Sequence, residues 1–178
     1  MEMKNHELDV FTESRLYIAY IDNHRANVKT AYDVNGIAIG KALSLSIADM
    51  KRLKQLIEVH DISKYCDEEF EGYRQYFYPA SGETKDKEKF DIAWKHHYTY
   101  NRHHYEAWLI NGQPTVMDPV YLAEMILDWE AMSRHFGGNP LDWYEKNKKT
   151  ITLHPITKKD VEQALHAVYH SGENLKNE

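Results

Sequence analysis

Apolar side chains recur every three or four residues in two stretches of the N-terminal half, which is the spacing of one face of an α-helix. The first stretch predicts a helix that begins near Thr12 or Ser14 and runs past residue 30. Its repeating positions are Tyr17, Ile21, His24, Val28 and Ala31. The second stretch follows Ser46, a residue suited to capping a helix N-terminus. Its repeating positions are Ile47, Met50, Leu53, Ile57 and His60. Each predicted helix therefore carries one histidine on an otherwise apolar face.

The middle of the chain predicts two more helices separated by a polar loop. The segment from Asp67 to Phe77 is typical of a short helix, and Pro79 ends it because proline does not continue a helix. The run from Ser81 to Lys89 has alternating charges, a glycine and no apolar residue, so it predicts a loop. From about Lys87 to His104 the helical spacing returns at Phe90, Trp94, His97, Asn101 and His104. Polar side chains thus share the inward face of this predicted helix.

The C-terminal third predicts a tight turn followed by three helices. The turn spans Leu109 to Gln113, and Asp118-Pro119 combines a capping residue with a proline at the first helical position. The next helix ends near Gly137-Gly138 and places on one face Tyr121, Met125, Asp128 and Met132. The remaining elements are a helix over Pro140 to Asn147, an extended link over Ile151 to Leu153, and a helix from Thr157 to Tyr169 closed by Gly172. We therefore predict an all-α fold of about six or seven helices in a single domain over residues 1–178, with a core over about 14–135 and C-terminal helices over 140–170.

The composition fits one domain that buries a core without disulfides, because the chain has 178 residues and a single cysteine, Cys66. The N-terminus has neither the basic start nor the apolar run of a secretory signal, so we expect a cytoplasmic protein. No stretch approaches the roughly 20 apolar residues of a membrane helix, so we expect no membrane partner. The net charge of −6 argues against an extensive nucleic-acid surface, which leaves a small-molecule substrate as the expected partner.

The eleven histidines carry the main functional signal. We expect His6, His154, His166 and His170 at the surface, and His96 and His135 mostly at the surface or next to the ligands of a site. By contrast, His24, His60 and His97 lie on three predicted apolar faces and Asp128 lies on a fourth, while Asp61 directly follows His60. Burying such groups without a cation costs several kcal/mol for each uncompensated charge. Imidazole nitrogen and carboxylate oxygen suit divalent ions, so the pattern predicts a site for one or two ions of Mn, Fe, Co, Ni, Zn or Mg.

The doublet His103-His104 offers two further ligands, and helical geometry helps to choose between them. On a continuous helix, His97, Asn101 and His104 fall within a narrow sector, whereas His103 points away. This favours His97 and His104. If the helix ends before His103, the doublet can contribute either ring or both.

The order of these residues resembles the HD-domain superfamily of metal-dependent phosphohydrolases. The stretch His60-Asp61-Ile62-Ser63-Lys64 is similar to the HDIGK signature of HD-GYP phosphodiesterases, with serine in place of glycine. His103-His104-Tyr105-Glu106 resembles the HHE segment of that group and Ile126-Leu127-Asp128 its terminal aspartate, although the Gly-Tyr-Pro triplet is absent. The likeness covers roughly residues 14–135. The HDxSK spacing and the later run from His97-Tyr98 to His104 also resemble an uncharacterised bacterial and phage family.

The resemblance implies a phosphohydrolase or phosphodiesterase in which a metal-activated hydroxide attacks a small nucleotide or related phosphoester. It implies a first metal ion held by His24, His60, Asp61 and Asp128. Asp61 would bridge to a second ion, held by His97 and by His103 or His104. Asp61 and Lys64 are the implied catalytic residues, and Lys64 would contact a phosphate oxygen of the substrate. The alternative for Lys64 is a solvated lysine at a helix end.

Several other polar residues have two interpretations each. Arg102 and Arg134 offer two parallel donors to a phosphate, although surface arginines without that role are commoner, and we expect Arg102 to bind substrate. Glu69 and Glu71 suit a general acid or an outer ligand, but such glutamates more often form a solvated face. The tyrosines within residues 73–78 suit a wall on which a base stacks, or ordinary core packing.

Two further functions fit the same residues. A branch of the HD superfamily, the diiron oxygenases, uses a similar set of four histidines and two aspartates. Two irons in a nitrogen-rich site reach a mixed-valence state that Mg or Zn cannot. The third hypothesis is a binding or regulatory protein that keeps the metal for stability and lacks catalysis. Iron content together with an electron paramagnetic resonance signal separates the oxygenase from the hydrolase.

Overall fold

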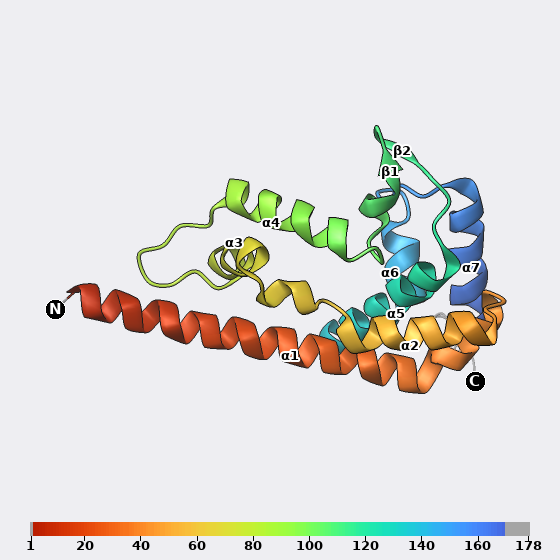
Figure 1. Cartoon of the computed structure of the whole chain (residues 1–178), viewed down its shortest axis with the longest axis horizontal. Coiled ribbons are helices and arrows are strands. Elements are labelled where there is room, and N and C mark those ends of the chain that lie inside the picture. The colour runs from red at the N-terminus through yellow and green to blue at the C-terminus, as the bar shows by residue number, and fades with distance from the viewer. Residues whose placement is uncertain (1, 170–178) are drawn as a thin grey trace. The chain divides into compact units, whose positions relative to one another are not determined.

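The structure is a computed structural model that describes the backbone of residues 2–169 and the side chains of residues 7–169. Its elements, in chain order, are α1 (Glu2–Ala42), α2 (Ile47–Val59), the 3₁₀ helix η1 (Ile62–Tyr65), α3 (Asp67–Phe77), α4 (Lys87–Tyr100), the 3₁₀ helix η2 (Tyr105–Trp108), β1 (Leu109–Ile110), β2 (Gln113–Pro114), α5 (Pro119–Phe136), α6 (Pro140–Asn147) and α7 (Pro155–Val168). Within the described residues there are seven α-helices and one hairpin whose two strands have two residues each. This content confirms the predicted all-α class (Figure 1). The side chain of His6, and all of His170 and Gly172, lie outside the described residues.

The chain divides into two compact units. Within the described residues, unit 1 comprises residues 2–25 and 61–101, and unit 2 comprises residues 26–60 and 102–169. Unit 1 therefore contains the N-terminal part of α1 with η1, α3 and α4, whereas unit 2 contains the C-terminal part of α1 with α2, the hairpin and the last three helices. The prediction of one domain over residues 1–178 stays a prediction.

The first helix is longer than its apolar pattern predicts. It begins at Glu2, so the predicted start near Thr12 or Ser14 is wrong, whereas the prediction that it passes residue 30 is confirmed. The residues before Thr12 include neither glycine nor proline, so nothing in them stops a helix. Leu8 and Phe11 are 63% and 58% exposed, which explains why no buried periodicity marks this part.

In unit 1, α3 and α4 lie side by side (Figure 1) because glycine allows a close approach between them. A Cβ atom at Gly72 of α3 would lie 2.8 Å from the carbonyl oxygen of Lys89 and 2.7 Å from the Cβ of Ala93. Both contacts are shorter than van der Waals packing permits. The predicted bounds of α3 are confirmed, and α4 begins at Lys87 after Asp86, whose carboxylate accepts a hydrogen bond from the backbone N–H of Lys89.

A buried arginine anchors the loop between these two helices. The Arg74 side chain has no exposed surface, and its guanidinium donates two hydrogen bonds of 2.7 Å to the carboxylate of Glu83. It also donates to the carbonyl oxygen of Tyr78 at 3.1 Å. Glu83 in turn accepts from the backbone N–H of Ala80 at 2.7 Å. The polar loop predicted from sequence is therefore held at its centre by an ion pair with α3.

The core of unit 1 is aromatic. The buried side chains Tyr17 and Ile21 of α1, Tyr73 of α3 and Ala93 of α4 form one cluster. Half-buried side chains packed against it are Tyr20, Tyr65, Phe70, Tyr78, Phe90 and Trp94. Tyr73 thus serves core packing, the commoner of the two interpretations given to the tyrosines of residues 73–78.

Unit 2 is built around α5, in which every residue from Leu122 to Asp128 is buried. Helices α2, α6 and α7 pack against it. Two predicted helix starts are confirmed, since Ser46 and Asp49 form a reciprocal capping box at α2 and the Asp118 carboxylate accepts from the N–H of Val120 at α5. The predicted start of the last helix at Thr157 is wrong. α7 begins at Pro155 after His154, whose Nδ1 accepts from the backbone N–H of Ile156.

The predicted tight turn is the loop of a hairpin. β1 and β2 pair antiparallel, with Leu109 opposite Pro114 and Ile110 opposite Gln113. Asn111 and Gly112 have φ angles of 51° and 75°, the left-handed conformation that a two-residue hairpin turn requires. None of the helices within residues 2–169 has the length and apolar character needed to cross a membrane.

Candidate metal centre

The dipeptide His60-Asp61 lies at a sharp backbone turn. α2 ends at Val59 and is followed by His60 with φ −50° and ψ 128°. Asp61 then adopts the left-handed conformation, with φ 55° and ψ 18°, before η1 begins. This conformation is uncommon for residues other than glycine, although aspartate adopts it more readily than most, and such outliers concentrate at functional sites. His60 is the last residue of its segment in unit 2 and Asp61 the first of its segment in unit 1.

In unit 1 the structure brings together three of the predicted ligands. Nε2 of His24, from α1, lies 3.4 Å from Oδ2 of Asp61. Nε2 of His97, from α4, lies 3.2 Å from Oδ1 of the same carboxylate. The three residues are 6%, 1% and 0% exposed in the order His24, Asp61, His97. Two imidazoles from helices far apart in the sequence therefore converge on one buried carboxylate.

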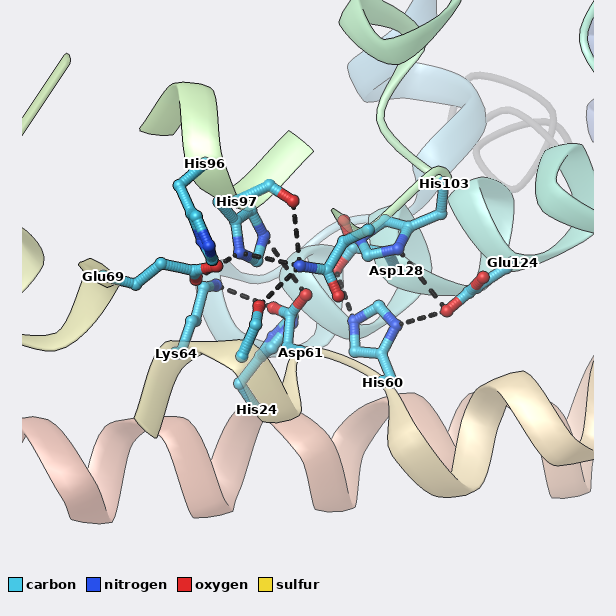
Figure 2. Close-up of polar contacts among 12 residues, drawn as sticks. His24, His60, Asp61, Lys64, Glu69, His96, His97, His103, Glu124 and Asp128 are labelled. Carbon is cyan, nitrogen blue, oxygen red and sulfur yellow. Dashed lines mark hydrogen bonds and ion pairs between the residues drawn. The ribbon is translucent and has the colours of Figure 1, made fainter. Parts of the chain in front are cut away.

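A buried glutamate on α3 orients His97. Oε2 of Glu69 lies 2.8 Å from Nδ1 of His97, and its Oε1 lies 2.8 Å from Nδ1 of the neighbouring His96 (Figure 2). A neutral imidazole that donates from Nδ1 carries its lone pair on Nε2. Nε2 of His97 is the atom that faces Asp61, so the ring presents a ligand atom in the direction that a metal site needs.

The charges around His97 raise its pKa. Burial alone would lower the pKa of this imidazole, but the carboxylates of Asp61 and Glu69 outweigh burial. The pKa of Glu69 is lowered, against the effect of its own burial, mainly because His97 is its partner. Positive charge between Asp61 and Glu69 is therefore stabilised. A divalent cation between Nε2 of His97 and Asp61 would be stabilised by the same negative charge.

Lys64 of η1 pairs with the central carboxylate. Its Nζ lies 2.7 Å from Oδ2 of Asp61 and 5.5 Å from the ring centroid of Tyr73. Asn101, which the sequence places on the inward face, follows α4 and donates from Nδ2 to Oγ of Ser63 at 2.6 Å and to the carbonyl oxygen of His97 at 2.9 Å. The contact with Ser63 connects the end of α4 to η1, the segment that follows Asp61.

In unit 2 the structure brings together His60, His103 and Asp128, and it adds Glu124. Nδ1 of His60 lies 2.9 Å from Oε1 of Glu124, while its Nε2 lies 3.7 Å from Oδ1 of Asp128. Nδ1 of His103 lies 3.4 Å from the same Glu124 oxygen, and the rings of His60 and His103 are 4.3 Å apart between centroids (Figure 2). One buried glutamate thus orients two histidines, as Glu69 does in unit 1.

These two histidines lower the pKa of Glu124. Burial alone would raise the pKa of this carboxyl, but the contacts with His103 and His60 outweigh burial and lower it to about 2. Glu124 therefore stays ionised at neutral pH, although it is only 3% exposed. An ionised acceptor fixes the Nδ1–H tautomer of His60 and directs Nε2 toward Asp128.

The helix predicted to reach His104 ends at Tyr100, so the helical phase that favoured His104 does not apply, and the choice between His103 and His104 stays open. The amide of Asn101 bonds back to the His97 carbonyl, and the chain leaves the helix before the histidine doublet. His103 is 1% exposed and contacts Glu124, whereas His104 is half-buried and packs its ring against that of His103, with 4.1 Å between centroids. The alternative of a helix that ends before His103 is the one observed.

One comparison with known proteins gives a match. The model of a family of unknown function, DUF5662, matches residues 13–167. The chain belongs to this family. Neither the curated proteins nor the solved structures contain a match. The two carboxylate–histidine groups thus lie within the region that DUF5662 defines.

Arg102, Arg134 and Glu71 of this DUF5662 chain have contacts with residues other than those of the histidine groups. Arg102 is exposed, with its guanidinium carbon 4.3 Å from the ring centroid of Trp108. The guanidinium of Arg134 donates two hydrogen bonds to Oε1 of Glu130, which lies one turn earlier in α5. Glu71 is exposed and pairs with Arg74. His135 and His166 are exposed as predicted, whereas His154 is half-buried at the start of α7.

The sequence interpretation missed the two glutamates that organise the histidines. Glu124 is not among the predicted ligands, although it lies one helical turn before Asp128 and so shares its face of α5. That spacing was the signal available. Glu69 was expected on a solvated face more often than in a site, but it is fully buried between His96 and His97. Its position in α3 gives no such signal, because its partners come from α4.

The donors present fit divalent ions. Unit 1 offers two imidazoles and a carboxylate, and unit 2 offers two imidazoles with the carboxylates of Glu124 and Asp128. Histidines that bind metals almost always donate their second ring N–H to a carboxylate, a carbonyl or water. His60 and His97 both have this arrangement, with an aspartate oxygen on the opposite ring nitrogen.

Proposed function

We propose that this protein is a metal-dependent phosphohydrolase that acts on a small nucleotide or a related phosphoester. The observation that carries the proposal is the repeated arrangement of a buried glutamate, an imidazole and an aspartate. Glu69, His97 and Asp61 form it in unit 1, and Glu124, His60 and Asp128 form it in unit 2. The HD-like order of these residues in the sequence supports the same reaction class.

The donor atoms suit one or two ions among Mn, Fe, Co, Ni, Zn and Mg. When bound, such an ion supplies Lewis acidity, which lowers the pKa of water toward neutrality and polarises a phosphoryl oxygen. The protein supplies the orientation. Glu69 and Glu124 hold the tautomers of His97 and His60. The glutamate, histidine and aspartate of each arrangement are buried, which limits competition from water.

Lys64 is the residue that we assign to substrate binding in unit 1. Its ammonium already lies 2.7 Å from Asp61, and its side chain is only 13% exposed. Asp61 would be a ligand of a bound cation, and Lys64, whose partner is the same carboxylate, would then be available to pair with a phosphate oxygen of the substrate. Arg102 is the second proposed phosphate contact, because its exposed guanidinium offers parallel donors.

The proposed setting is a reducing cytoplasm, with a small-molecule substrate as the partner. The only cysteine in the sequence, Cys66, forms no disulfide, and the net charge of −6 disfavours a broad nucleic-acid surface.

The test is a hydrolysis assay with metal-depleted protein reloaded with Mn²⁺, Co²⁺, Ni²⁺ or Mg²⁺. The substrates are nucleoside mono-, di- and triphosphates, cyclic nucleotides, and the mono- and bis-esters of p-nitrophenyl phosphate. We expect release of phosphate, nucleoside or p-nitrophenol with at least one metal. Asp61→Asn should abolish it, and asparagine is preferred to alanine because it tolerates the left-handed backbone at this position.

Matched variants make the assay specific. Lys64→Met should raise KM more than it lowers kcat, whereas Lys95→Met, at an exposed lysine of α4, should change neither. No hydrolysis of any of these esters with any of these metals would overturn the proposal, as would full activity in Asp61→Asn.

A second candidate, an HD-type diiron oxygenase, is favoured by one observation. Each group holds two buried histidines, His24 and His97 in unit 1 and His60 and His103 in unit 2, so each donor set is rich in nitrogen. Such a set suits iron. Protein loaded anaerobically with Fe²⁺ and partially oxidised would then give a mixed-valence electron paramagnetic resonance signal. Absence of that signal in iron-loaded protein counts against the oxygenase.

A further inference from the structure

A second cluster of metal-ligating side chains lies in unit 1, and its histidine is the neighbour of His97 in sequence. It consists of the thiol of Cys66, the carboxylate of Glu68 and the imidazole of His96. One ligand atom from each residue lies within 4.8 Å of the others. Cys66 directly precedes α3, Glu68 belongs to its first turn, and His96 comes from α4.

His96 is held in a fixed orientation, unlike a typical surface histidine. Its Nδ1 lies 2.8 Å from Oε1 of Glu69, a side chain with no exposed surface. Its ring also stacks on that of Tyr100, with 4.4 Å between centroids. The contact with Glu69 repeats the arrangement seen for His97, since the neutral ring donates from Nδ1 and carries the lone pair on Nε2. His96 is thus oriented as a metal ligand is.

We infer that Cys66, Glu68 and His96 form a separate binding site for a divalent cation of the zinc class. Thiolate, imidazole and carboxylate are the three ligand types that Zn²⁺ takes, and three protein ligands leave a fourth position for water or another ligand. Binding breaks the S–H bond of Cys66, releases the proton to solvent and forms a sulfur–metal bond. The inference does not depend on the proposed hydrolase activity.

The donor separations are compatible with such a site. Zinc binds sulfur at about 2.3 Å and nitrogen or oxygen at about 2.0 to 2.2 Å, so two ligand atoms of a tetrahedral ion lie about 3.3 to 3.7 Å apart. The three donors lie within 4.8 Å of one another, so they need to approach by at most about 1.5 Å, which side-chain rotation can supply. Cys66 and His96 are half-buried and Glu68 is exposed, which gives an ion access from solvent.

Cobalt is the probe, because Cys66 is the only cysteine in the chain. The full-length protein, reduced and metal-depleted, is titrated anaerobically with Co²⁺ while its absorption is recorded. We expect a saturable thiolate-to-cobalt charge-transfer band in the near ultraviolet, which reports on the sulfur site alone because Co²⁺ held by the carboxylate–histidine groups has no sulfur ligand. The band should be absent in Cys66→Ser. This variant should fold, because the Cys66 side chain caps no backbone group of α3 and serine is a favoured N-cap residue.

Variants of the other two ligands decide between a built site and a lone thiol. His96→Gln and Glu68→Gln should each weaken Co²⁺ binding, as measured by this band, by about tenfold or more. Asp67→Asn, at an exposed carboxylate in the same turn, should leave it unchanged, and so should Asp61→Asn. The inference is overturned if no charge-transfer band forms, or if the band titrates identically in His96→Gln and in the wild type. Because Asp61→Asn tests the proposed catalytic group separately, failure of one proposal is distinguishable from failure of the other.

Discussion

Oε1 of Glu124 lies 2.9 Å from Nδ1 of His60, with both side chains buried. Glu69 has the same relationship to His97 at 2.8 Å. In each case the opposite ring nitrogen faces an aspartate, Asp128 for His60 and Asp61 for His97. Both imidazoles are therefore held with their metal-binding nitrogen toward a carboxylate, and this gives the buried glutamates a role that a solvated carboxylate could not have.

We predict that Glu124→Gln lowers metal affinity. A neutral amide holds the Nδ1–H tautomers of His60 and His103 less strongly than a carboxylate does. Loss of such a partner typically costs about 10- to 100-fold in metal affinity. Equilibrium dialysis against buffered Co²⁺ or Mn²⁺, followed by elemental analysis, measures the change.

Glu130→Gln is the matched control for that experiment. Glu130 is also buried on α5, but its partners are Asn35, Arg134 and Tyr169. We expect this variant to lose stability while it keeps its metal affinity. Equal losses of affinity in the two variants would show that Glu124 acts through the fold alone.

The lowered pKa of Glu124 predicts a pH dependence of stability in metal-free protein. The pKa of its carboxyl is 4.5 when unperturbed and about 2 in the folded chain. A group with a depressed folded pKa contributes stability that is present above its unfolded pKa and is lost as the pH falls toward the folded one. Between pH 4.5 and about 2, the wild type should therefore lose more of its free energy of unfolding than Glu124→Gln does. Urea denaturation across this window measures the difference, and parallel losses would refute the assignment.

Tyr17 gives a test of the unit 1 core. Its hydroxyl is buried and has no hydrogen-bond partner among the described residues. Because a buried unpartnered polar group costs about 1 to 3 kcal/mol, Tyr17→Phe should raise the free energy of unfolding by up to that amount. Tyr169→Phe should lower it, since that hydroxyl donates to Glu130 at 2.6 Å. Urea denaturation of both variants supplies the comparison, and a clear loss of stability in Tyr17→Phe would contradict the account.

Gly72 tests the packing that places His97. A Cβ at this position would overlap the backbone of Lys89, which cannot move without displacing α4. Gly72→Ala should therefore cost about 1 to 3 kcal/mol of stability. Gly36→Ala in α1 should cost far less, because the added methyl meets only the Tyr32 side chain and alanine favours a helix interior. Thermal unfolding of the two variants compares them directly. Similar losses would mean that α3 and α4 tolerate a wider separation.

Local signals explain why several helices could be predicted from the sequence. The capping pair Ser46 and Asp49 and the Asp118-Pro119 start act within one turn, so their effect is readable without tertiary knowledge. The end of α4 was not readable in this way. No glycine or proline follows Tyr100 directly, and the helix ends where the Asn101 amide bonds to the His97 carbonyl.

The candidate ligands could be predicted from the sequence, whereas the buried glutamate Glu69 that supports them could not. His24, His60, His97 and Asp128 interrupt apolar faces, and that interruption is visible in a periodic pattern. Glu69 is ionised and buried only because His96 and His97 reach it from another helix. A carboxylate whose burial depends on a distant partner looks, in sequence, like any solvated glutamate.

The most direct test of the central claim, that the buried carboxylate–histidine groups bind divalent ions, is the metal content of the protein. The Cys66→Ser background removes the sulfur ligand of the separate cluster. After equilibration with buffered Mn²⁺ or Co²⁺ and removal of excess ion, elemental analysis should find one or two ions per chain, and fewer in Asp61→Asn. A chain that retains no ion, or an Asp61→Asn variant that retains as much as its parent, would contradict the claim.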